Sequence, residues 1–80
     1  MKNGIGRELP VDELHARQIV VLVKEGRPAA TMWVARIGID YVCFYAGEIK
    51  TTLICTRKPD GTLEDDTPAR IRVFEYLGGV

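Results

Sequence analysis

Serine is absent from this 80-residue chain, and histidine occurs only once, as His15. These shortages exclude the usual Ser-His arrangement of nucleophilic catalysis, which needs a nucleophile beside an oriented base. Asp12 precedes His15 at a helical spacing, at which a carboxylate could orient an imidazole as a general base. No nucleophile accompanies them in a recognisable arrangement, so we interpret His15 as a solvated surface residue. A small enzyme is therefore the least favoured of three function classes, the others being a protein-interaction module and a nucleic-acid-binding module.

The chain also lacks an excess of either charge, because eleven basic and eleven acidic residues cancel. Domains that bind nucleic acid non-specifically usually carry a basic excess, since counterion release from phosphates supplies their affinity. Any contact with nucleic acid would therefore depend on a local patch. Zero net charge also gives little repulsion between copies, which favours self-association.

Long apolar runs are missing as well. No stretch approaches the roughly 20 apolar residues that a membrane-spanning helix needs. The first residues, MKNGIGRELPVDEL, contain no apolar region of the kind that marks a signal peptide. We therefore expect a soluble, cytoplasmic protein without membrane contact.

Cysteine is scarce, and both copies, Cys43 and Cys55, lie in the apolar runs VCFY and LICT. This placement favours reduced thiols in the core, with a disulfide or a redox role as alternatives. Their twelve-residue spacing, without a CxxC motif or a histidine cluster, does not fit zinc. The acidic run at 64–66 is interpreted as a solvated loop, because neighbouring side chains on an extended backbone point apart. We expect neither a metal nor another cofactor.

The pattern that the chain does contain is that of β-strands. Alternating or β-branched stretches predict strands at 19–23, 31–37, 41–46, 48–56 and 70–77. Turn signals recur between them at spacings of about 9–13 residues, as in an antiparallel meander. We predict a single all-β domain over residues 9–78, a five-stranded antiparallel meander closed into an SH3-like or similar small barrel. The IVVLV run at 19–23 predicts a strand covered on both faces.

Two N-terminal segments are less regular. Residues 1–8 contain two glycines among polar residues and are predicted to form a flexible arm. Residues 10–17, PVDELHAR, fit a short helix, since proline suits its first position and acids suit its first turn. Alternatively, HARQIVVLVK at 15–24 could form a longer strand, and both alternatives stay open.

The segment at 58–69 allows two topologies. KPDGT at 58–62 predicts a type I turn closed by a left-handed glycine, which could join a hairpin. Alternatively, the whole segment forms one long loop, and strand 70–77 pairs directly with 48–57. Adjacent acids tolerate strand pairing poorly, so we favour the loop.

The last strand, RIRVFEYL, has two unlike faces. One is apolar, with Ile71, Val73 and Leu77 interrupted by Glu75, and the other is basic and aromatic. Under direct pairing, two residues of the 48–57 strand would lie beside that second face. The predicted partner-binding residues are therefore Arg70, Arg72, Phe74, Tyr76, Lys50 and Thr52.

This face has three interpretations. Interfaces favour aromatic residues and arginine, which indicates contact with a protein partner or with a second copy. Single-stranded nucleic acid could stack its bases on the rings and place its phosphates on the basic groups. Alternatively, the rings form a second small core beneath the N-terminal segment. We favour a non-catalytic interaction module, a homo-oligomer in its simplest form, with nucleic-acid binding as the alternative.

Overall fold

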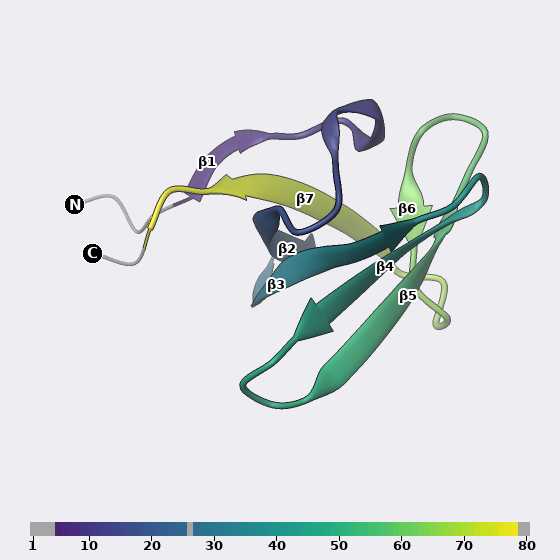
Figure 1. Cartoon of the computed structure of the whole chain (residues 1–80). Coiled ribbons are helices and arrows are strands. Elements are labelled where there is room, and N and C mark those ends of the chain that lie inside the picture. The colour runs from purple at the N-terminus through teal and green to yellow at the C-terminus, as the bar shows by residue number, and fades with distance from the viewer. Residues whose placement is uncertain (1–4, 26, 79–80) are drawn as a thin grey trace.

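The computed structural model describes residues 5–25 and 27–78. Nearly all regular structure in these residues is β-strand, and the helical part is a single three-residue 3-10 turn, which confirms the all-β prediction. The elements, in chain order (Figure 1), are β1 (Ile5–Glu8), the 3-10 helix η1 (Val11–Glu13), β2 (Ile19–Lys24), β3 (Arg27–Ile37), β4 (Tyr41–Ala46), β5 (Thr51–Arg57), β6 (Leu63–Glu64) and β7 (Arg70–Tyr76).

The strands form one antiparallel sheet that closes on itself. Its order is β1-β7-β2-β3-β4-β5-β6, and an additional pairing of β6 with β7 completes a six-stranded barrel. β1 lies outside the closed ring, along β7 (Figure 1). The predicted antiparallel small barrel is therefore confirmed, with seven strands in place of the five expected.

The core is built by alternation along the strands. Val20 and Leu22 point inward from β2, Met32 and Val34 from β3, and Phe44 lies fully buried among them. The IVVLV prediction holds only in part. Val21 is buried on the outer face, whereas Ile19 on the same face is half exposed.

The favoured topology for the last strand is wrong. β7 pairs with β1, β2 and β6, while β5 pairs with β4 and β6, so the short β6 lies between the two strands expected to be neighbours. Pairing is possible despite the acidic run because Glu64 meets Lys58 at 3.4 Å and Asp65 turns inward to Lys24.

The N-terminal segments also differ from expectation. Residues 1–4 of the predicted arm lie outside the described residues, but Ile5–Glu8 is a strand. Of the possible helix at 10–17, only one 3-10 turn forms, and it has no side-chain cap. Leu9, Val11 and Leu14 are buried around it, so tertiary packing holds this segment where helix propensity could not.

Candidate interaction surface

The predicted alternation along β7 is present. Ile71 and Val73 are buried in the core. Leu77, expected on the same face, lies beyond the strand and is exposed. The outward residues are the four predicted ones, Arg70, Arg72, Phe74 and Tyr76, of which Phe74 is half-buried.

Arg72 is committed to contacts within the molecule. Its guanidinium donates to both carboxylate oxygens of Glu8 at 3.0 and 2.7 Å, and its central carbon lies 5.2 Å from the Phe74 ring centroid. The hydrogen bond from Arg72 holds the pKa of Glu8 below its usual range. One ring face of Phe74 is therefore covered by a cation that is itself paired, which leaves this pair poorly suited to base stacking.

Lys50 and Thr52 do not lie beside β7. Thr52 is opposite Tyr45 on β4, and Lys50 lies in the β4–β5 turn with a left-handed φ of 52°. The prediction that strand 70–77 pairs directly with 48–57 is wrong because β6 lies between β5 and β7. The six predicted site residues are thus divided among different parts of the barrel.

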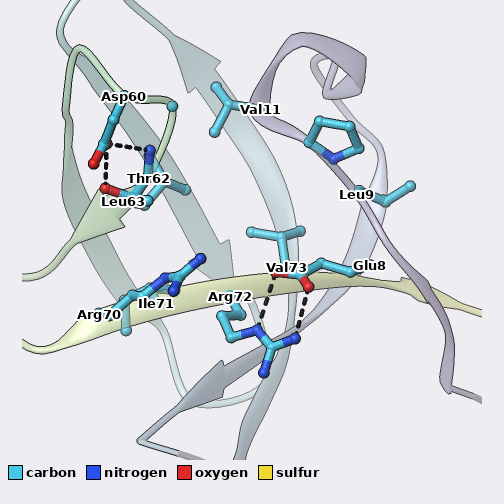
Figure 2. A pocket seen from close by; sticks show the side chains of 12 residues that line it. Glu8, Leu9, Val11, Asp60, Thr62, Leu63, Arg70, Ile71, Arg72 and Val73 are labelled. Carbon is cyan, nitrogen blue, oxygen red and sulfur yellow. Dashed lines mark hydrogen bonds and ion pairs between the residues drawn. The ribbon is translucent and has the colours of Figure 1, made fainter.

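Arg70 lines a small cleft of about 360 Å³ between the β5–β6 turn, the segment after β1, and β7. Figure 2 shows Asp60 and Thr62 on one side of the cleft and Glu8 and Leu9 on the other. Asp60 accepts hydrogen bonds from the Thr62 amide at 3.0 Å and the Thr62 hydroxyl at 2.6 Å. With Arg72 bonded to Glu8 as well, most polar groups in this cleft are already satisfied.

A larger hollow, which we call the apolar groove, has a volume of about 810 Å³. It is lined by the large side chains of Ile19, Trp33, Ile49 and Tyr76, which are 47%, 49%, 66% and 38% exposed. The remaining lining is small or neutral apart from Glu48. Tyr76 is the only predicted site residue that contributes to it.

Trp33 is held in place at one side of this groove. Its ring meets Tyr45 edge-on, with centroids 6.3 Å apart and an interplanar angle of 85°. The two residues are cross-strand partners on β3 and β4, and Ile19 is the partner of Trp33 on β2. The sequence did not reveal that these outward side chains lie beside one another on neighbouring strands. Alternation in TMWVARI marks the face of Trp33, but only the barrel shows that this face is the outer one.

The remaining candidate residues give no second site. His15 is exposed, and its backbone N–H donates to the Gln18 side chain. Both cysteines are free, with Cys55 in the core and Cys43 half-buried on the outer face, so the core prediction holds for Cys55 alone. Within residues 5–25 and 27–78, no group of three or more metal-ligating side chains is found.

No helix in the described part of the chain is long and apolar enough to span a membrane. The chain matches no protein-family model, and neither curated proteins nor solved structures are significantly similar to it. Its fold and its groove are therefore the basis for assigning a function.

Proposed function

We propose that this barrel is a non-catalytic interaction module that binds another protein chain through the apolar groove. The observation that carries the proposal is the clustering of Ile19, Trp33, Ile49 and Tyr76, each more than a third exposed, around one hollow. Contiguous exposed apolar surface with a polar rim marks interaction sites. Covering a large apolar side chain contributes about 1.5–3 kcal/mol, so a few such contacts support specific binding.

The groove shifts the proposed surface from that expected from sequence. Tyr76 remains part of it, whereas Arg72 and Phe74 are engaged with Glu8 and each other. A hollow is complementary to a narrow segment of the partner rather than to a flat sheet. Self-association stays within the proposal, because a second copy of a chain with zero net charge is a partner that meets little repulsion.

The finer features predicted from sequence belong to the same proposal. An SH3-like barrel and a cytoplasmic location are consistent with a small antiparallel barrel, and we propose both on the sequence pattern. No observation favours binding of single-stranded nucleic acid, since the Arg72–Phe74 pair that would contact bases is occupied within the chain.

The test uses two matched substitutions. Ile49→Ser removes an apolar group from the groove, while Ile39→Ser makes the same change at a residue that is 92% exposed and does not line it. Light scattering over a concentration series measures self-association. Selection from a random peptide library, followed by affinity measurement, detects binding of a foreign segment.

We expect association in one of the two assays, weakened about tenfold or more by Ile49→Ser and unchanged by Ile39→Ser. A protein that stays monomeric at high concentration and enriches no peptide above an unrelated control domain would contradict the proposal. Binding that responds equally to the two substitutions would place the interaction elsewhere.

A further inference from the structure

The apolar groove lies beside a part of β3 that has a neighbouring strand on one side only. β3 has eleven residues and β4 has six, and their pairing begins at Trp33 with Tyr45. Before Trp33, β3 continues to pair with β2, but no described strand pairs with its other edge. In Figure 1, β4 diverges from β3 toward the β4–β5 turn, and Ala46, Gly47 and Ile49 of this region line the groove.

The direction of the backbone groups along β3 follows from the hydrogen bonds of Val34. Its N–H donates to the Gln18 carbonyl at 2.8 Å, and its carbonyl accepts from the Arg17 N–H at 2.7 Å, so both groups point toward β2. Successive residues of an antiparallel strand alternate between the two edges. The N–H and carbonyl of Trp33 therefore point toward β4, and those of Thr31, two residues earlier, point to the same side.

Thr31 lines the groove, and none of the described strand residues is paired with it on that side. Its N–H and carbonyl thus offer one donor and one acceptor to whatever occupies the hollow. An unpaired strand edge is a template for an added strand. Pro28, which lacks an N–H, limits such pairing to the residues that follow it.

We propose that an extended segment of a partner protein adds to β3 at Thr31, in the position that a longer β4 would occupy. This inference rests on the proposed function and specifies how the groove is filled. Main-chain hydrogen bonds to Thr31 supply the alignment, and alternate side chains of the segment pack against Trp33 and Ile49.

The charge of the groove adds one requirement for the segment. Among the described residues, Glu48 is the only charged one that lines the hollow, and it forms no ion pair with any of the others. A lysine or arginine in the bound segment would complement it. The expected occupant is therefore an extended segment with alternating apolar residues and one basic residue, rather than a helix.

The experiment uses the synthetic peptide acetyl-KTVTIT-amide as the probe, in which the lysine, valine and isoleucine share one face of an extended strand. Trp33 is the only tryptophan of the chain and lines the groove, so its fluorescence reports occupancy without a label. Amide hydrogen exchange reports whether the Thr31 N–H becomes protected. Two further peptides carry N-methyl groups on one or the other set of alternate amides, and a fourth has glutamine in place of lysine.

We expect the probe to shift the Trp33 emission and to protect the Thr31 N–H from exchange. One N-methylated peptide should bind about tenfold or more weakly than the other, because only one set of amides in an added strand faces β3. Glu48→Gln should weaken binding of the lysine peptide but not of the glutamine peptide, and Thr31→Val should keep the binding because it preserves the backbone groups.

Three outcomes would overturn strand addition. The first is a fluorescence shift without Thr31 protection and with equal affinity of both methylated peptides, which leaves the groove as an interaction site filled in another way. The second is Thr31 protection that increases with protein concentration in the absence of peptide, which assigns the edge to a second copy. The third is the absence of both the fluorescence shift and the Thr31 protection at millimolar probe. The proposed function is tested separately, by light scattering and by the peptide-library selection.

Discussion

Asp65 lies in an environment that its neighbours in the sequence do not predict. It lies in the acidic run at 64–66, yet it is only 7% exposed. One carboxylate oxygen accepts from the Thr67 N–H and hydroxyl and from the Ala69 N–H, and the other accepts from Lys24 at 2.8 Å. A buried carboxylate is tolerable when it is fully bonded, and here it organises the connection between β6 and β7.

We expect Asp65→Ala to lower the melting temperature by roughly 10 °C or more, since it leaves several backbone and side-chain donors unsatisfied. Asp65→Asn should have a smaller effect, because an amide oxygen can still accept from Thr67 and Ala69. Asp66→Ala, a change in the exposed neighbouring acid, is the control and should leave the melting temperature nearly unchanged. Thermal unfolding followed by circular dichroism measures all three, and equal effects at the two positions would contradict this role.

The same carboxylate predicts acid sensitivity. Hydrogen bonds from Lys24 and Thr67 hold the pKa of Asp65 well below its usual range. A carboxylate whose pKa is lower in the folded than in the unfolded protein stabilises the folded state at pH values above its unfolded-state pKa, which is near 4 for aspartate. That stabilisation is lost as the pH falls toward the folded-state pKa. The free energy of unfolding should therefore decline below about pH 4. In Asp65→Asn, urea titrations should show a shallower decline, with Glu8 accounting for part of what remains.

The two cysteines should react differently. Cys55 is fully buried, and burial raises the pKa of its thiol to about 12. Alkylation requires the thiolate, so iodoacetamide at mild pH should modify the half-buried Cys43 in the folded protein and Cys55 only after unfolding. Intact-mass measurement should show one adduct and then two. Rapid addition of two adducts to the folded protein would show that Cys55 is not held in the core.

At the scale of elements, the β5–β6 hairpin shows what local sequence can specify. The predicted type I turn is confirmed, because the Gly61 N–H donates to the Lys58 carbonyl and Gly61 has a φ of +87°. Turn chemistry acts within a few residues, so KPDGT was sufficient to identify it. The partner of the following strand depends on residues far along the chain, and there the prediction failed.

Gly61→Ala should lower the free energy of unfolding by about 1–2 kcal/mol, because an L-residue at a left-handed φ is strained. The site is open, so no steric clash adds to this effect. Gly47→Ala is the control, since Gly47 has no left-handed φ and an added Cβ would make only an ordinary contact with Tyr45 at 3.6 Å. Urea denaturation of both variants measures the difference, and equal losses would rule out backbone strain as the cause.

β6 is the element that sequence reasoning was least able to find. It has only two residues, Leu63 and Glu64, so it carries no periodicity. Its place is set by the burial of Leu63 in the core and by pairing with both β5 and β7. Because β6 was not predicted, Lys50 and Thr52 were wrongly expected to lie beside β7.

For the whole molecule, closure of the sheet concentrates stability in one core. Leu22 is 1% exposed and packs among inward residues of several strands. Leu22→Ala should lower the free energy of unfolding by about 2–5 kcal/mol. Leu77→Ala, the same change at a residue that is 59% exposed, should stay within about 0.5 kcal/mol of the parent. Similar losses in the two variants, measured by urea denaturation, would contradict a single core inside the barrel.

Features that depend on neighbours along the chain could be predicted from the amino-acid sequence. Alternation fixed most strands and the two faces of β7, and proline, aspartate and glycine fixed the turn at 58–62. These signals are sufficient because side-chain period and turn geometry are properties of a few adjacent residues.

Which faces turn outward and which strands become neighbours could be established only from the folded barrel. It brought Ile19, Trp33, Ile49 and Tyr76, from four separate regions of the chain, to one groove, and it directed Asp65 inward. Closure of the barrel pairs strands that are far apart in the sequence, so it depends on long-range contacts. The edge left free at Thr31 depends on where β4 leaves β3, and no local pattern in either strand records that point.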